Sequence, residues 1–178
     1  MKFEHSDRIS APRDTVYNLV RDHLSDLASY LPSVKEIKTL EKQSQGKDKT
    51  FILNQWFADV KLPSWIQALI PESLFSWKDR ATWDDTKYEV TYVLESMVSQ
   101  EVFKASGKNT FKFLSETEME LVVSCEVEIF ADKIPGVPKL LARKVQTAIE
   151  PMIEKMLAPN MTSLGLGINK YLEKKKLS

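Results

Sequence analysis

The sequence contains very little cysteine or histidine. One Cys and two His occur among 178 residues, so a zinc site built from these residue types is not expected, and a single thiol cannot form an internal disulfide. An excess of charge is also lacking, because 25 Lys and Arg balance 25 Asp and Glu. A dedicated nucleic-acid-binding protein usually carries a basic excess. Neither a metal nor nucleic acid is therefore an expected partner.

Long hydrophobic runs are absent as well. No uncharged apolar stretch approaches the ~20 residues that cross a bilayer, and the charged residues of 1–8 exclude the apolar core of a signal peptide. The composition, 43% hydrophobic and 28% charged, is ordinary for a soluble globular protein. We expect a cytoplasmic protein with a single domain spanning 1–178.

Glycine is too scarce for a phosphate-binding loop. The chain has five Gly, and only Gly165 and Gly167 lie close together, without the rest of a dinucleotide-binding fingerprint. His5 and His23 are the only candidate bases for a Ser–His–Asp arrangement, and no nucleophile-elbow motif accompanies them. Cys125 falls on the apolar face of a predicted strand, where a buried and inert thiol is expected. The sequence therefore predicts no catalytic residue and no cofactor.

Hydrophobic periodicity gives the order of elements. A period of two over 2–10 predicts a strand, and apolar residues at helical spacing predict one or two short helices from Pro12 to about Tyr30. After Asp132 the pattern is helical to the end, with an expected kink at Pro151 and a candidate break at Pro159. Between these parts, the pattern predicts strands at 34–45, 50–60, 74–84, 88–94, 100–115, with Gly107 as a bulge or turn, and 118–129.

The clearest of these strands is 118–129. Its apolar residues alternate strictly with a second set that is mostly acidic, so one face is hydrophobic and the other polar. This pattern is typical of an antiparallel sheet with one solvated side. The apolar face consists of Met119, Leu121, Val123, Cys125, Val127 and Ile129, and the acidic residues are Glu118, Glu120, Glu126 and Glu128.

Three segments resemble the START-like, or SRPBCC, superfamily. The opening ISAPRDTVYNLV (9–20) is similar to its strand that runs through Ala-Pro into a helix, and YLPSV (30–34) is similar to its entry into the second strand. The segment IPGVP (134–138), before a long amphipathic helix, is similar to its ending. The resemblance implies an α+β helix-grip fold, in which a curved antiparallel sheet of about seven strands wraps around the C-terminal helix. Along the chain, the implied order is one strand, two helices, six strands and one long helix (β-α-α-β6-α). The apolar insertion at 61–73 and the prolines of the last helix depart from the family pattern.

The resemblance also implies a cavity between the sheet and the helix that receives a hydrophobic molecule. Filling of a solid core is the alternative role for its apolar residues. Two polar residues on apolar faces, Gln55 and Asp79, are candidate contacts for a ligand, as are His5 and Asp7; internal hydrogen bonds are the alternative. The candidate apolar lining consists of Trp56, Trp77, Trp83, Tyr92, Phe103 and Phe113 from the strands, and Met152 and Met156 from the helix.

The proline-bounded segment 61–73 is a candidate lid or membrane contact, and packing on the protein's own body is the alternative. The apolar residues concerned are Trp65, Ile66, Leu69 and Ile70. Nearby Lys61 and the cluster Lys174–Lys176 favour a transient contact with an anionic membrane surface.

The expected function is binding or transfer of a lipid or another hydrophobic small molecule. The alternatives are an aromatase/cyclase-type enzyme that uses Asp79 with His5 in the same pocket, and an interaction adaptor that uses 61–73. A continuous cavity of roughly several hundred Å³ would favour the first two. Ligand identity and oligomeric state stay open.

Overall fold

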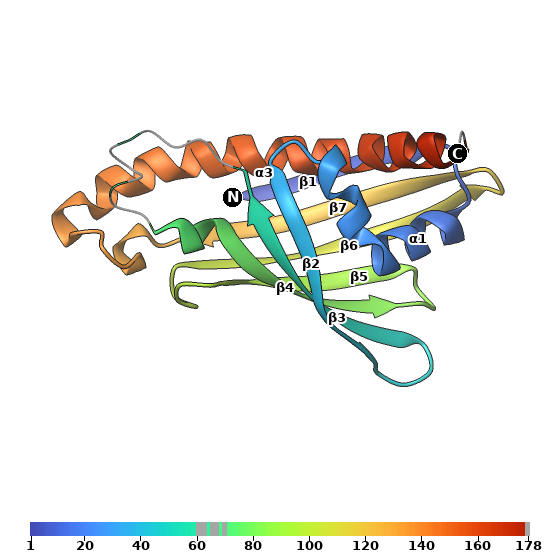
Figure 1. Cartoon of the computed structure of the whole chain (residues 1–178), viewed down its shortest axis with the longest axis horizontal. Helices are drawn as coiled ribbons and strands as arrows, with labels where there is room; N and C mark the ends of the chain where they lie inside the picture. Colours follow the sequence, from blue (N-terminus) through green and yellow to red (C-terminus); the bar gives the residue numbers. More distant parts are fainter. Residues whose placement is uncertain (60–63, 65–67, 69–70, 177–178) are drawn as a thin grey trace.

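The computed structural model describes residues 1–59, 64, 68 and 71–176. Within the last helix it describes the backbone alone at residues 152, 153, 155–162 and 176. One antiparallel sheet carries a helical layer on one face, and the long helix α3 (Lys139–Lys176) runs along the whole length of that layer (Figure 1). The architecture is α+β, as predicted.

The seven strands of the sheet lie in the order β1-β7-β6-β5-β4-β3-β2. Every neighbouring pair is antiparallel, and the first strand in the sequence pairs with the last. The six strands predicted after the short helices are therefore confirmed. The strands are β1 (Lys2–Ile9), β2 (Val34–Ser44), β3 (Lys49–Ala58), β4 (Ser76–Asp84), β5 (Glu89–Ser96), β6 (Phe103–Ser115) and β7 (Glu118–Ile129).

Strand β2 carries two irregularities that explain its unusual pattern. Its buried residues Val34 and Ile37 are three positions apart, whereas a regular strand alternates every two. The pairing with β3 shifts register between Val34 and Glu36 and again between Thr39 and Glu41. Each shift changes which face the following residues occupy, and Leu40, next to the second shift, is 49% exposed.

The short helices α1 (Arg13–Asp22) and η1 (Leu24–Tyr30) lie where the sequence predicted them. Pro12 precedes the first helical residue, and Asp14 lies in the first turn of α1, where a carboxylate interacts favourably with the helix dipole. The one-turn helix η2 (Glu72–Phe75) precedes β4, so this strand begins at Ser76 rather than at residue 74. A further turn, η3 (Ala131–Lys133), follows β7.

Helix α3 differs from the prediction at its start and at Pro159. It begins at Lys139, because η3 and Gly136, with φ of +90°, first turn the chain away from the sheet. The helix continues through Pro151 and Pro159 to Lys176, so the candidate break at Pro159 is wrong. Each proline removes one backbone hydrogen bond, and the bonds of the neighbouring turns suffice to keep the helix continuous.

Helix α3 approaches β1 closely because Gly165 has no side chain. A Cβ atom at Gly165 would lie 2.5 Å from the Cβ of Asp7, well inside van der Waals contact.

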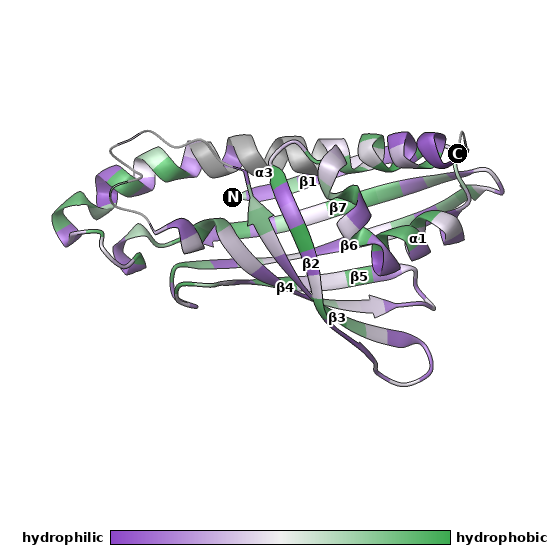
Figure 2. Ribbon diagram, in the orientation of Figure 1, coloured by the Kyte–Doolittle hydropathy of each residue, from purple (hydrophilic) through white to green (hydrophobic). Residues whose placement is uncertain are grey.

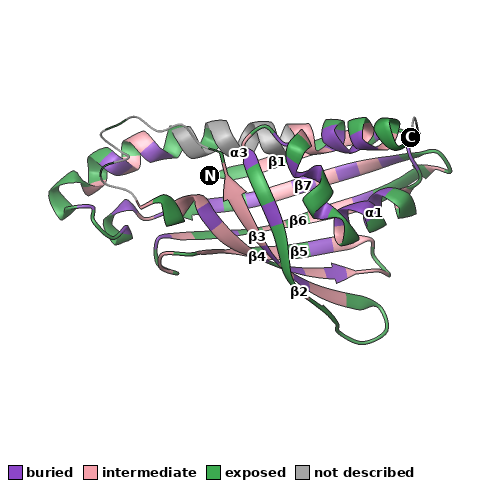
Figure 3. Cartoon of the chain, in the orientation of Figure 1, coloured by how far each residue is buried: buried purple, intermediate pink, exposed green. Residues whose placement is uncertain are grey.

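Apolar residues alternate with polar ones along the strands (Figure 2), and buried residues follow the same alternation (Figure 3). The inward face of β7, from Met119 to Ile129, is at most 7% exposed, as its sequence pattern predicted. The core therefore lies between the sheet and the helical layer.

Candidate ligand-binding site

A cavity of about 150 Å³ lies between the inner face of the sheet and the helical layer. Its described walls are mainly apolar, and Leu164 is the lining residue from the described side chains of α3. The cavity is smaller than the several hundred Å³ expected, because bulky indole and phenol rings occupy the inner face of the sheet. The lining residues are Val20, Leu24, Leu31, Val34, Asn54, Trp56, Trp77, Asp79, Ala81, Trp83, Val90, Tyr92, Leu94, Asn109, Val123, Cys125 and Leu164.

Asp79, in the middle of β4, is the acidic residue of this wall and is only 8% exposed. Its Oδ2 accepts a hydrogen bond from Trp56 Nε1 at 3.3 Å, and the side chain of Asn54 also hydrogen-bonds the carboxylate. Burial raises the pKa of Asp79 to about 6, and these two hydrogen bonds oppose the rise. Thr39 Oγ1 donates to Asn54 Oδ1 at 2.9 Å, so the Asn54 amide group is oriented with its nitrogen free to donate.

Three buried polar atoms on the cavity wall have no hydrogen-bond partner within the described part of the protein. They are Asp79 Oδ1, Trp83 Nε1 and Asn109 Oδ1. A buried polar group without a partner costs about 1–3 kcal/mol. Most such groups in native proteins are paired, so three unpartnered atoms on residues around one cavity are an unusual feature of this wall.

Aromatic rings form much of the wall around Asp79. The indoles of Trp56 and Trp77 stack with an interplanar angle of 12° and centroids 6.1 Å apart. Trp83 packs against Tyr17 edge-to-face at a centroid distance of 5.2 Å. These contacts hold the three indoles in place, and the rings present flat apolar surface to a ligand.

Tyr92 lies across Gly107, and this contact corrects the prediction for that glycine. Gly107 is a paired residue in the middle of β6, opposite Tyr92 on β5 and Cys125 on β7, and not a bulge or turn. A Cβ atom there would lie 2.3 Å from the Tyr92 hydroxyl. The missing side chain lets the Tyr92 hydroxyl reach over β6 and donate to the carbonyl of Ser124 at 2.9 Å.

The two other titratable groups on the wall are neutral at physiological pH. Burial raises the pKa of the Tyr92 hydroxyl above its ordinary value, and burial also raises the pKa of the Cys125 thiol. Cys125 is 5% exposed, in agreement with the expectation of a buried, inert thiol. Asp79 is therefore the group on the described wall that changes charge near neutrality.

The structure brings together five of the residues proposed from the sequence, namely Trp56, Trp77, Asp79, Trp83 and Tyr92. Sequence reasoning missed Asn54 and Asn109, although a signal for Asn54 exists. Neighbouring strand residues face opposite sides of a sheet, so Trp56 on the inner face implies Asn54, and not Gln55, beside it.

Three proposed lining residues lie elsewhere. Gln55 points away from the cavity, and its Nε2 donates to Ser76 Oγ at 3.0 Å. Phe113, near the end of β6, is 53% exposed, with the Arg13 guanidinium 5.7 Å from its ring centre. Phe103 packs against the core and borders an outer hollow of about 790 Å³.

His5 does not pair with Asp79, contrary to the arrangement considered for an enzyme. Its Nε2 lies 3.0 Å from Oδ1 of Asp7, two residues along the same strand. Neither His5 nor Asp7 lines the cavity. The side chains of Met152 and Met156 and the segment residues Trp65, Ile66, Leu69 and Ile70, together with Lys61, lie outside the described residues.

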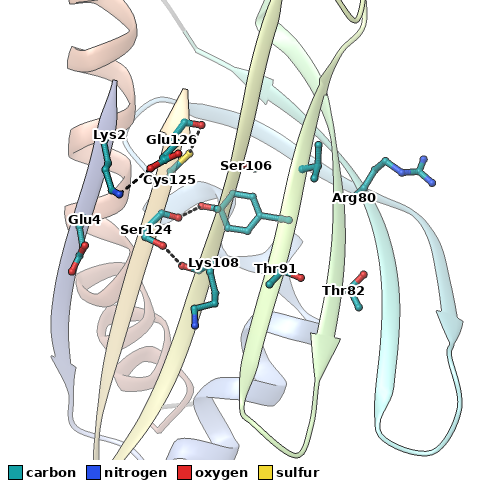
Figure 4. A pocket seen from close by; sticks show the side chains of 13 residues that line it. Lys2, Glu4, Arg80, Thr82, Thr91, Ser106, Lys108, Ser124, Cys125 and Glu126 are labelled. Atoms are coloured by element: carbon teal, nitrogen blue, oxygen red, sulfur yellow. Dashed lines mark hydrogen bonds and ion pairs between the residues drawn. The ribbon is translucent and has the colours of Figure 1, made fainter. Parts of the chain in front are cut away.

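The outer face of the sheet carries a wider hollow of about 520 Å³ with a different character. Figure 4 shows its polar side chains on β1, β4, β5, β6 and β7. Lys2 Nζ lies 2.9 Å from Glu126 Oε1, and Ser124 Oγ donates to the Lys108 carbonyl at 2.9 Å. No described residue that lines the outer hollow has an unpartnered buried polar atom, in contrast to the inner cavity.

Two kinds of site receive no support from the described residues. No group of three or more His, Cys, Asp or Glu is placed there to hold a metal ion. Within the same part of the chain, no helix has the length and apolar character required to span a membrane.

Comparisons with known proteins give structural likeness without sequence matches. No family model and no curated protein matches the chain. The Zhui aromatase/cyclase from Streptomyces sp. R1128 is similar with a TM-score of 0.67 and 16% identity, over 97% of this chain and 95% of that one. The protein TTHA0849 from Thermus thermophilus is similar with a TM-score of 0.63 and 16% identity, over 94% of this chain and 97% of that one.

A norcoclaurine synthase point mutant from Thalictrum flavum is also similar, with a TM-score of 0.59 and 13% identity, over 99% of this chain and 96% of that one. At this level of identity the likeness concerns the fold. The chain has the helix-grip fold that its sequence resemblance implied.

Proposed function

We propose that the protein binds a small hydrophobic molecule in the cavity between the sheet and the helical layer, and holds or transfers it. The observation that carries this proposal is an apolar cavity whose wall contains three unpartnered buried polar atoms. Apolar walls with a few convergent polar groups are typical of small-molecule sites. The solved structures with the same fold include proteins named for activity on small molecules, which supports the proposal.

The size of the cavity limits the ligand. An apolar cavity of about 150 Å³ holds roughly one benzene ring, and the cavity here has that volume. A ligand of this size fits the cavity as it stands, whereas a long acyl chain requires the sheet and the helical layer to separate. The proposal therefore favours a compact molecule, or the ring end of a larger one, over a complete phospholipid.

A second candidate function is catalysis in the same cavity, in line with the aromatase/cyclase alternative. One observation favours it: burial raises the pKa of Asp79 to about 6, within the range that suits a general acid or base. His5 is paired with Asp7, so Asp79 would act without that histidine. A binding protein needs only the pocket, whereas an enzyme also needs Asp79 to exchange a proton with its substrate.

Native mass spectrometry of the purified chain, followed by solvent extraction, tests the binding function. The matched variants are Ala81→Leu, which adds volume inside the cavity, and Ser106→Ala, which alters an exposed residue of the outer face. We expect a bound small molecule with the native chain and with Ser106→Ala, and its loss with Ala81→Leu. Equal retention by a folded Ala81→Leu variant would contradict the proposed site.

A further inference from the structure

The carboxylate of Asp79 has no cationic partner in the described part of the protein. No described ion pair includes it, and its two hydrogen-bond donors, Trp56 and Asn54, are neutral. The described lining residues include no Lys, Arg or His. A buried carboxylate is normally paired or neutralised by protonation, and Oδ1 accepts no hydrogen bond from the described residues.

The rings around this carboxylate add a second attraction for a cation. Trp56, Trp77 and Tyr92 line the same cavity as Asp79. The face of an indole or phenol ring carries negative potential, and a cation within about 6 Å of the ring centre is stabilised, more strongly so when water is excluded. Aromatic walls with a single buried carboxylate therefore form an environment suited to an organic ammonium group.

We propose that the ligand of this cavity is a hydrophobic amine in its protonated form, with the ammonium group hydrogen-bonded to Asp79 Oδ1 and the apolar part against the indole rings. This inference rests on the proposed function, because it assigns the chemical class of the molecule bound there. An ammonium group both donates to the unpartnered oxygen and neutralises the carboxylate. A hydroxyl group provides only the hydrogen bond.

The other two unpartnered atoms belong to a different part of the cavity. Trp83 and Asn109 both pair with Val90, on neighbouring strands, so they lie in one row across the sheet. Trp83 is four residues from Asp79 along β4, which corresponds to ~13 Å in an extended strand. One small ammonium group cannot contact both places, so Trp83 and Asn109 take no part in this assignment.

Three probes of nearly equal shape test the proposal on the intact chain: benzylamine, benzyl alcohol and ethylbenzene. Binding is measured at pH 7.5 by calorimetry and by NMR shifts. We expect benzylamine to bind about tenfold or more tightly than benzyl alcohol, since hydrogen bonds to charged groups are the stronger ones. In Asp79→Asn, the preference for benzylamine should disappear, while ethylbenzene binds as it does to the native chain.

A pH series on the native chain provides a test that needs no variant. Tyr92 and Cys125, the other titratable groups facing Asp79, stay neutral throughout because burial raises the pKa of each. Benzylamine stays protonated between pH 7.5 and 5, whereas Asp79, with a pKa of about 6, becomes protonated. The preference for benzylamine over benzyl alcohol should therefore decline toward pH 5.

The outcomes separate the two proposals. If ethylbenzene binds in the cavity but benzylamine binds no more tightly than benzyl alcohol at pH 7.5, the amine assignment is overturned and the binding function stands. An unchanged preference in a folded Asp79→Asn variant also overturns the assignment. If none of the three probes binds, both proposals fail.

Discussion

The indole nitrogen of Trp56 donates a hydrogen bond to the buried carboxylate of Asp79, at 3.3 Å across the neighbouring strands β3 and β4. The bond uses one carboxylate oxygen and leaves the other, Oδ1, unpartnered. Since Asn54 also binds this carboxylate, β3 supplies two donors that fix its orientation. The pairing thereby places a titratable group on the cavity wall.

Stability should depend on the protonation of Asp79. Its pKa is raised from 3.8 when unfolded to about 6 in the folded protein, so the folded state binds the additional proton between these values and stability falls as pH rises from about 4 to about 6. Asp79→Asn removes this dependence. Relative to the native chain, the free energy of unfolding of the variant should therefore increase by up to about 3 kcal/mol as the pH rises from 4 to 7.

Urea unfolding at pH 4 and pH 7 measures this gain. Asp48→Asn is the control, because Asp48 is an exposed residue whose side chain takes no part in the cavity. The same pH dependence in Asp79→Asn and in the native chain would contradict a raised pKa at Asp79.

Gly107 should tolerate no side chain. In Gly107→Ala the new Cβ would lie 2.2 Å from the Ser124 carbonyl oxygen and 2.3 Å from the Tyr92 hydroxyl. Overpacking of this kind costs about 1–3 kcal/mol, so thermal unfolding should show a clearly lower Tm. Ser106→Ala, on the exposed neighbour in β6, should change the free energy of unfolding by no more than about 0.5 kcal/mol. Equal Tm values for the two variants would refute the close contact.

The two glycines of α3 provide an internally matched pair. A Cβ at Gly165 would lie 2.5 Å from Asp7 Cβ, whereas a Cβ at Gly167 would come no nearer than 3.1 Å to Tyr30 Cβ. Both substitutions to Ala improve helix propensity by about the same 1 kcal/mol. The difference in the free energy of unfolding between the two variants therefore reports on packing. Chemical denaturation should find Gly165→Ala less stable than Gly167→Ala. The opposite order would mean that α3 lies farther from β1 than the structure shows.

Asp85 should stabilise the fold through Tyr17. The carboxylate accepts hydrogen bonds from Tyr17 Oη at 2.8 Å and from Arg21 Nη1 at 2.9 Å. Tyr17 is 1% exposed, so Asp85→Ala leaves a buried hydroxyl unpartnered, at a cost of about 1–3 kcal/mol. In a double-mutant cycle with Tyr17→Phe, the loss from Asp85→Ala should shrink. Strictly additive effects would show that the two side chains are not coupled.

The sequence predicted the order of the strands well because the solvated outer face forces alternation. In β7, for example, Glu126 and Glu128 flank the buried Val127, and the period of two is evident. At the site, the prediction of Gln55 beside Trp56 conflicts with the same alternation. Adjacent residues of a strand face opposite sides, so the correct companion is Asn54.

Other features depend on contacts between segments that are distant in the sequence. The role of Gly107 is set by the Tyr92 ring from another strand, and no local pattern reveals it. The partner of His5 is Asp7 on the same strand face, which the alternation of 2–10 already contained. The exposure of Phe113 follows from its place near the end of β6, beyond the part of the sheet that lines the cavity.

The most direct test of the central claim is an NMR titration of the native chain with ethylbenzene, in which methyl shifts are followed residue by residue. Val90, Leu94 and Val123 line the cavity, whereas Val93 is 51% exposed on the outer face. We predict saturable shifts of the three cavity residues, little change at Val93, and loss of the response in Ala81→Leu. Shifts that are equally large at Val93, or that persist in Ala81→Leu, would contradict binding in this cavity.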